Sequence, residues 1–252
     1  MIEINYDEVR EELEKKNLYD IQKDLTSSRR LRTAIMSLLT TALLLTIAYG
    51  MLEDPLVYTL SNIGNFFDYK IYFIIWSVVA GLSIQFTVGV LFKLEEYKSK
   101  FGYHFIGISV ALLILTALIP ALKDIYPFWH TVHTVTSGLH ALFLYLALVP
   151  FSIWVSKENP RLRLTIFIWL GIVWAGSILM IILFRHSALF ELWYFITNII
   201  FLLYLSLVLF EKEIIKKSVK LMINEDNLNV AIEKVFVNLE NLTEKKKGKV
   251  KT

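Results

Sequence analysis

The chain alternates between long hydrophobic runs and short polar segments. Six runs reach the length of about 20 residues that a helix needs to cross the hydrocarbon core of a bilayer. They cover Leu31–Leu52, Ile71–Phe92, Phe101–Leu122, Phe128–Val155, Leu164–Phe184 and Ala188–Phe210. Each run predicts a helix, because backbone groups in lipid must be satisfied internally and the runs are too long for barrel strands. The pattern therefore predicts an all-α, polytopic membrane protein with a six-transmembrane-helix bundle.

Both ends of the chain have the pattern of amphipathic helices. Residues 6–25 carry a narrow apolar stripe, and Asn5 followed by Glu8 three residues later has the pattern of an N-terminal capping box. Near the other end, apolar residues recur every four and three positions, at Leu228, Ile232, Val235, Leu239 and Leu242. Two heptads are fewer than a coiled coil needs. Two interpretations therefore stay open: the end helices pack on each other or on the spans, or residues 228–242 bind a second copy or a partner helix.

Basic residues predict the orientation of the spans. The polar segments on one side of the bundle are rich in them, at Arg29, Arg30, Arg32, Lys93, Lys98, Lys100, Lys157, Arg161, Arg163, Lys212, Lys216, Lys217 and Lys220. The opposite side carries only Lys70, Lys123 and Arg185. Basic segments stay in the cytoplasm. We therefore expect a multi-pass protein of the cell membrane with both termini cytoplasmic: an amphipathic helix over 1–30, the bundle over 31–210, and a helix with a basic tail over 211–252.

Composition agrees with this prediction and excludes several functions. Hydrophobic residues make up 56 % of the 252 residues and charged residues 19 %, whereas soluble proteins carry about 25 % charged residues. The net charge of +3 does not indicate a nucleic-acid partner. The sequence has no cysteine, which excludes disulfides and thiolate chemistry. No nucleotide-binding glycine motif occurs, and we expect no cofactor.

Polar residues inside the spans are costly in lipid and are therefore candidate functional residues. His133 and His140 share one face of the fourth span with Ser137. Glu191 and Asn198, also seven residues apart, share a face of the sixth span. By residue count, His133 and Glu191 are expected at one depth in the bilayer, and His140 and Asn198 at a second, deeper one. We therefore predict that His133 contacts Glu191 and that His140 lies near the depth of Asn198.

The loop Glu53–Lys70 adds polar residues on the same side of the membrane. We expect it to form an extracytoplasmic-facing polar pocket with the outer halves of the fourth and sixth spans. His133 and Glu191 would be its acid/base pair. The predicted ligand-binding residues are His130, His140, Arg185, Ser61, Asn65 and Asn198. Among these, Arg185 would hold an anionic head group.

Other interpretations of these polar residues remain open. They are also explained by hydrogen bonds between helices, which contribute about 0.6 kcal/mol each in membrane proteins. His130 and His133, three residues apart, are able to ligate a metal, but the usual helical metal motifs are absent. Haem would need paired histidines near the midplane, where only His140 is expected. We therefore expect no metal site.

Short motifs in the loop and the fourth span resemble a known family. Ser61-Asn62-Ile63-Gly64 after the first span and His130-Thr131-Val132-His133 in the fourth are similar to those of six-span proteins known as the domain of unknown function 998 family. That family resembles the Frag/DRAM group, which has an aspartate where this chain has Asn62. The resemblance covers about residues 33–210. It implies a six-helix bundle with outward-facing functional residues and, through Frag/DRAM, a link to lipid remodelling or membrane trafficking.

We therefore expect an integral membrane protein that recognises or processes a membrane lipid or another amphiphile. Whether it is an enzyme stays open. One alternative is a non-enzymatic membrane anchor or assembly subunit that acts through its cytoplasmic helices. The other is a small-solute or proton-coupled carrier with a relay through His133, His140 and Glu191. A carrier needs further polar groups towards the inside, and beyond Gln85 the sequence has almost none.

Overall fold

The computed structural model describes residues 6–184 and 187–249, and their regular structure is entirely helical. Side chains are described over 19–184, 187–219 and 221–222. Six helical segments are long and apolar enough to cross a membrane: Tyr19–Gly50, Lys70–Leu94, Lys100–Leu118, Pro127–Glu158, Pro160–Phe184 and Ala188–Val219. The predictions of an all-α chain and of six candidate membrane-spanning helices are thus confirmed.

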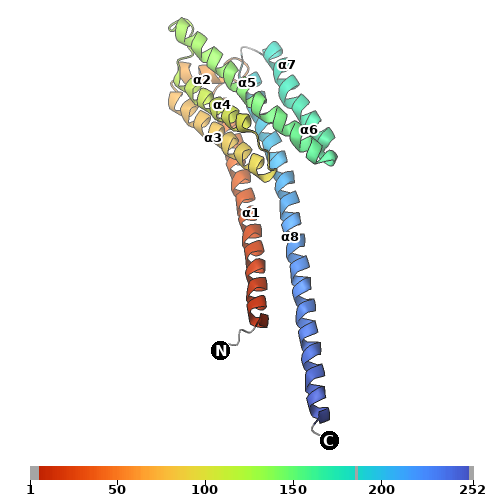
Figure 1. The fold of residues 1–252 in the computed structure, drawn as a ribbon. Coiled ribbons are helices and arrows are strands. Elements are labelled where there is room, and N and C mark those ends of the chain that lie inside the picture. Colours follow the sequence, from red (N-terminus) through yellow and green to blue (C-terminus); the bar gives the residue numbers. More distant parts are fainter. Residues whose placement is uncertain (1–5, 185–186, 250–252) are drawn as a thin grey trace. The chain divides into compact units, whose positions relative to one another are not determined.

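The first and last candidate spans belong to longer continuous helices (Figure 1). These are α1 (Tyr6–Gly50) and α8 (Ala188–Lys249). Between them lie α2 (Leu60–Phe66), α3 (Lys70–Leu94), α4 (Lys100–Leu118), α5 (Pro127–Glu158), η1 (Pro160–Leu162), α6 (Arg163–Leu170), η2 (Gly171–Ala175) and α7 (Gly176–Phe184). No glycine or proline interrupts residues 6–49 or 188–247. The helices therefore continue through the polar boundaries expected near 30 and 210.

The chain forms two compact units, one of residues 32–209 and one that combines residues 1–31 with 210–252. In the second unit, the Lys217 ammonium donates to Ser28 Oγ at 2.9 Å. Leu25 and Ile214 are buried. The backbone over 228–242 is helical, but its side chains lie outside the described residues. The prediction that this segment binds a partner helix therefore stays a prediction.

In the larger unit, α8 is the most enclosed candidate span. Its most apolar stretch is 61 % buried, against 17 % for the span that contains α6 and α7. On one side, Trp76 of α3 packs edge-on against Phe195, with ring centroids 4.7 Å apart. On another, a Cβ at Gly50 of α1 would lie 2.5 Å from the Leu192 side chain, so the missing side chain permits close packing. Contacts between neighbouring helices also join α3 to α4 and α4 to α5.

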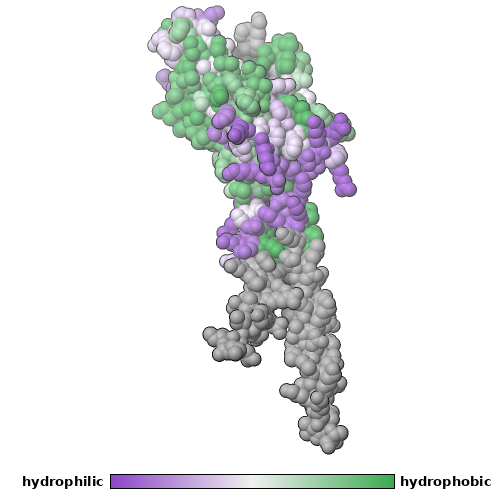
Figure 2. All heavy atoms as spheres, viewed as in Figure 1, coloured by the Kyte–Doolittle hydropathy of each residue, from purple (hydrophilic) through white to green (hydrophobic). Residues whose placement is uncertain are grey.

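The fifth span is interrupted and only partly packed. A π-helical turn, η2, separates α6 from α7. α6 packs against α5, but α7 shares no contact of comparable extent with it and diverges from it in Figure 1. Ile181, Ile182 and Leu183 of α7 are exposed. Figure 2 shows hydrophobic residues over much of the visible side of this unit, with hydrophilic residues gathered where α5 meets α6.

The larger unit has a loop end and a basic end. The loop end carries residues 51–69 and 119–126 and the start of α8, whereas the basic end carries the connections 95–99 and 159–162. At the loop end, the Ala188 amide donates to the carbonyl oxygens of Pro55 and Tyr58, at 2.9 and 2.7 Å. These bonds satisfy an amide at the start of α8, which has no partner within its own helix. They also hold the loop over this end of the bundle.

Candidate functional site

A cavity of about 750 Å³ lies at the loop end of the bundle. Helices α2, α3, α4, α5, α7 and α8 all contribute to its lining. The lining includes these residues predicted from the sequence: Ser61, His130, His133, His140 and Glu191. Asn65 and Asn198 are not part of it. Arg185 lies outside the described residues, so its predicted role stays a prediction.

Ser61 lies between the two residues that were expected to pair directly. His133 Nε2 is 2.8 Å from Ser61 Oγ. The Glu191 carboxylate accepts from the Leu60 amide at 2.5 Å, and the Ser61 hydroxyl is also within its reach. Within the described residues, His133 and Glu191 form no direct hydrogen bond. His133 and Glu191 are linked through Ser61, because the short helix α2 brings this serine between α5 and α8. Their role as an acid/base pair stays a prediction.

Close packing determines the position of α2. Tyr49 donates its hydroxyl to the Leu60 carbonyl at 2.8 Å, and its ring stacks on Phe73 and Trp76 at 5.7 and 5.6 Å. A Cβ at Gly64 would lie 2.7 Å from Phe73 Cβ and 2.8 Å from the Tyr49 hydroxyl. Only glycine leaves enough room for α2 to approach α1 and α3 this closely.

Asn65 supports α2 from outside the cavity. Its amide donates to the Ser61 carbonyl at 2.7 Å, and its Oδ1 accepts from Lys70 Nζ at 2.9 Å. Lys70 also donates to the Ile119 carbonyl at 3.2 Å. Lys70 therefore joins α2 to the end of α4. From the sequence, this lysine bears only on orientation, because nothing in the local pattern indicates a distant carbonyl as its partner.

His140 is paired with Ser109 of α4. Its Nδ1 donates to the Ser109 carbonyl at 2.9 Å, and Ser109 donates its hydroxyl to the His140 carbonyl at 3.0 Å. The imidazole stacks on Phe195 at 5.8 Å and meets Tyr194 edge-on at 5.9 Å. Asn198 lies about one turn further along α8 and donates to the Tyr194 carbonyl. The prediction that His140 and Asn198 lie at a similar depth in the membrane stays a prediction.

Three buried polar atoms on the cavity wall lack hydrogen-bond partners in the described part of the chain. They are His133 Nδ1, His140 Nε2 and the Tyr194 hydroxyl. A backbone carbonyl accepts from His140 Nδ1, so the neutral ring has its proton on Nδ1 and presents Nε2 as an acceptor. The Tyr194 hydroxyl both donates and accepts. Buried polar groups are normally hydrogen-bonded, which makes these atoms candidate ligand contacts.

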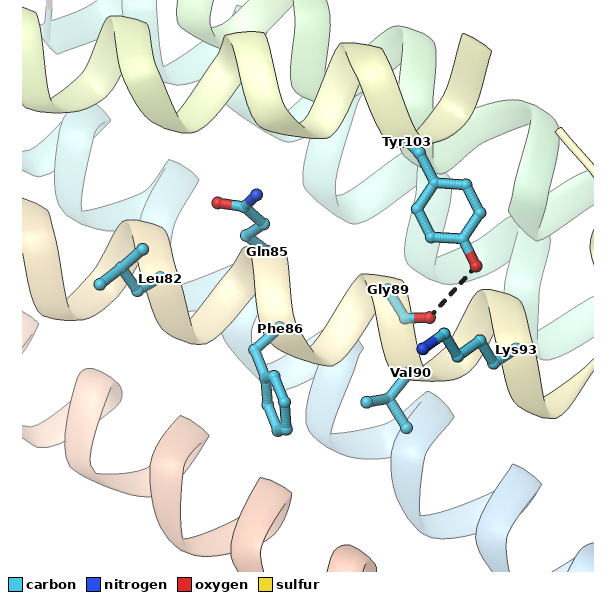
Figure 3. Close-up of a pocket in the computed structure, with 7 residues that line it drawn as sticks. All are labelled: Leu82, Gln85, Phe86, Gly89, Val90, Lys93 and Tyr103. Carbon is cyan, nitrogen blue, oxygen red and sulfur yellow. Dashed lines mark hydrogen bonds between the residues drawn. The ribbon is translucent and has the colours of Figure 1, made fainter. Parts of the chain in front are cut away.

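His130 and Gln85 lie at different ends of the unit. His130 Nδ1 donates to the Ala121 carbonyl at 2.6 Å, so this nitrogen is already engaged at the loop end. Gln85 lines a second hollow of about 510 Å³, where it lies on the side of α3 that faces α4 (Figure 3). In the same hollow, the Tyr103 hydroxyl approaches the Gly89 carbonyl at 3.5 Å. The two hollows have no lining residue in common.

The described residues contain no group of three or more side chains that could hold a metal ion. The expectation of a protein without a metal remains a prediction. No protein-family model, curated protein or solved structure matches this chain. The resemblance to the six-span family, based on the motifs around Ser61 and His133, likewise stays a prediction.

Proposed function

We propose that this protein binds a membrane lipid or another amphiphile in the cavity at the loop end, for recognition or for processing. The observation that carries the proposal is a single open cavity with both polar and apolar walls. Ser61, His133 and Glu191 form one polar group in it, whereas Leu113 and Ile181 belong to its apolar lining. Ligand sites typically combine apolar walls with a few hydrogen-bonding groups in this way.

The packing of α5 and α7 supports a lateral entrance from the bilayer. The cavity lining includes Gly138 of α5 and Ile181 of α7, and both residues are exposed. α7 does not close against α5 as α6 does. A Cβ at Gly138 would have no atom within 4 Å, so this glycine borders free space. In this proposal an amphiphile passes between α5 and α7 without leaving the membrane.

The proposal also includes an orientation. The loop end faces outward, both termini are cytoplasmic, and the ligand comes from the outer leaflet of the cell membrane. The basic end carries Lys93, Lys98, Lys100, Lys157, Arg161 and Arg163, and the described loop end only Lys70 and Lys123. This asymmetry supports the orientation. An even number of crossings would also put both chain ends on one side.

A bulky residue at Gly138 tests the lateral entrance. We expect Gly138→Trp to lower photo-crosslinking to a diazirine-bearing phosphatidylcholine, in phosphatidylcholine nanodiscs, by about tenfold, which corresponds to about 1.4 kcal/mol. Gly171→Trp is the matched control, because a Cβ at Gly171 also has no atom within 4 Å and Gly171 does not line the cavity. Equal crosslinking of the two variants would contradict the entrance. Crosslinked peptides outside α2, α5, α7 and α8 would contradict the binding site.

A second candidate function is a membrane anchor or assembly subunit. The observation that favours it is the separate compact unit of residues 1–31 and 210–252. An anchor would tolerate Gly138→Trp and lose its function when the segment after Val219 is removed. The carrier hypothesis has less support, because the cavity and the hollow at Gln85 have no lining residue in common.

A further inference from the structure

We propose that Ser61 is a catalytic nucleophile activated by His133, and that the cavity hydrolyses an ester lipid through an acyl–Ser61 intermediate. This inference rests on the proposed function, since it needs an amphiphile in the cavity. It goes further in naming the nucleophile, the base and the class of substrate. The expected acid/base pair of His133 and Glu191 is thereby replaced by a pair of His133 and Ser61.

The distance between the two side chains is that of a nucleophile and its base. Ser61 Oγ and His133 Nε2 are 2.8 Å apart, and both residues line the cavity. A serine hydroxyl is a weak nucleophile until an adjacent base accepts its proton. The pair is also buried, with exposed fractions of 8 % for Ser61 and 4 % for His133. Water therefore competes little for either group.

The surroundings of His133 favour the tautomer that this role requires. The backbone carbonyls of Thr116 and Ile119 lie near the imidazole, although His133 Nδ1 forms no hydrogen bond with the described residues. Carbonyl oxygens attract an N–H group, which favours a proton on Nδ1 and leaves Nε2 free to accept from Ser61. In known serine hydrolases, a carboxylate hydrogen-bonded to Nδ1 orients the histidine; here two nearby carbonyls stand at that side of the ring without a formed hydrogen bond.

Glu191 is a positioning residue in this arrangement. Its carboxylate accepts from the Leu60 amide, the residue immediately before Ser61. The Tyr49 hydroxyl donates a hydrogen bond to the carbonyl of the same residue, Leu60. The backbone that carries the nucleophile is thus held by a side chain from α8 and another from α1. Such support keeps a reacting atom in place.

The reaction balances with the substrate and water alone. Ser61 Oγ attacks the ester carbonyl carbon while its proton passes to His133 Nε2. The carbonyl-to-alkoxy bond then breaks, and His133 returns the proton to the leaving alcohol oxygen. Water next attacks the acyl–Ser61 carbon with His133 again accepting a proton. The carboxylic acid leaves as the proton returns to Ser61 Oγ.

The deeper wall indicates which esters fit. His140 Nε2 is a buried acceptor without a partner among the described residues, and the Tyr194 hydroxyl is a buried group able to donate. A substrate with a free hydroxyl and a carbonyl oxygen would satisfy both atoms. Monoacylglycerol-type lipids carry both groups next to an ester. We therefore name a fatty-acid ester with a free alcohol as the substrate class.

A serine-directed probe tests the nucleophile. The full-length protein in phosphatidylcholine nanodiscs is treated with an alkyl fluorophosphonate, and the modified peptide is identified by mass spectrometry. We expect an adduct on Ser61 that Ser61→Ala abolishes. His133→Gln should slow its formation by at least about a hundredfold, the size of general-base catalysis. Ser83→Ala is the matched control, because Ser83 is buried, donates to the Val79 carbonyl and does not line the cavity. An adduct elsewhere, or none, would overturn the proposal.

A cysteine variant keeps the test valid if Ser61→Ala fails to fold. Because the sequence has no cysteine, Ser61→Cys introduces a single thiol. We expect iodoacetamide to alkylate it much faster than it alkylates the double variant Ser61→Cys with His133→Gln. Equal rates would show that His133 does not act as a base. Normal phosphatidylcholine crosslinking without a Ser61 adduct would refute the nucleophile and leave the proposed binding function intact, whereas loss of crosslinking refutes the binding function itself.

Discussion

At the scale of single residues, the backbone of one apolar residue, Leu60, connects polar side chains at the cavity. Leu60 donates its amide to Glu191 and accepts the Tyr49 hydroxyl at its carbonyl. Its own side chain is buried and takes no part in these bonds. These two backbone hydrogen bonds also fix the position of Ser61, the next residue. The candidate site therefore depends on backbone groups that side-chain chemistry alone does not reveal.

Gly64→Ala should disturb this arrangement. The added Cβ would lie 2.7 Å from Phe73 Cβ, so α2 must shift away from α3. We expect a loss of about 1–3 kcal/mol of stability, as for overpacking elsewhere, together with a weaker Ser61 adduct. Thermal unfolding in detergent measures the first effect. Gly171→Ala, where a Cβ has no atom within 4 Å, should leave stability unchanged or slightly raised. Similar losses for both variants would contradict the packing argument.

Tyr49→Phe tests the hydrogen bond to Leu60 without changing the stacked ring. We expect a loss of about 0.5–1.5 kcal/mol, the usual contribution of one hydrogen bond. The fluorophosphonate reaction at Ser61 should also become slower, because the carbonyl before the nucleophile loses its support. Thermal unfolding and adduct rates measure the two effects. Tyr145→Phe is the control, since the Tyr145 ring packs on Trp174 and does not line the cavity. An unchanged adduct rate in Tyr49→Phe would separate this bond from the site.

At the scale of elements, α2 and the π-helical turn are the two features that shape the cavity. α2 has seven residues, with Thr59 as its N-cap accepting from the Asn62 amide at 3.1 Å. The turn η2 ends where α7 begins, and α7 supplies Ser177 and Ile181 to the cavity. Trp193 of α8 donates to the Ile172 carbonyl at 3.2 Å within this turn. π-helical turns leave carbonyls without the usual helical partner, and they are frequent at functional sites.

Trp193→Phe should destabilise the interrupted fifth span. The change removes the donor to the Ile172 carbonyl but keeps an aromatic ring beside Gly176. We expect a loss of about 1 kcal/mol, measured as a lower thermal unfolding temperature in detergent. Trp129→Phe is the control, because Trp129 is exposed at the start of α5 and its ring packs edge-on against Phe128. Equal shifts in both variants would assign the effect to tryptophan removal in general.

At the scale of the whole molecule, orientation in the membrane decides which side reaches the cavity. Leu56 lies in the loop-end segment and is exposed, and Lys98 is exposed in a basic-end connection. In a chain without cysteine, each position can carry a single one. We expect a membrane-impermeant maleimide to label Leu56→Cys on intact cells, and Lys98→Cys only after permeabilisation. The reverse pattern would overturn the orientation and the proposed access from the outer leaflet.

The sequence predicted the spans well and the candidate site in part. His133 and Glu191 share a predicted depth, Ser61 lies in the predicted outer loop, and all three line one cavity. The hydrogen bonds of His133 to Ser61 and of His140 to Ser109 were not predicted. Depth follows from counting residues, whereas contacts depend on the tilt and rotation of each helix. Those quantities come from packing between helices that lie far apart in the sequence.

By itself, the sequence determined that this chain is helical, that six segments can cross a membrane, and which polar residues lie within them. These properties follow from local causes, because each apolar residue favours lipid and each backbone group needs a partner within its own helix. Only the tertiary structure decided that α2 inserts Ser61 between His133 and Glu191, and that α7 diverges from α5. The physical reason is that these arrangements depend on close packing at Gly64 and on hydrogen bonds such as that from Tyr49 to Leu60. The residues that make these contacts belong to different helices, and the periodic pattern of apolar residues within one helix does not indicate them.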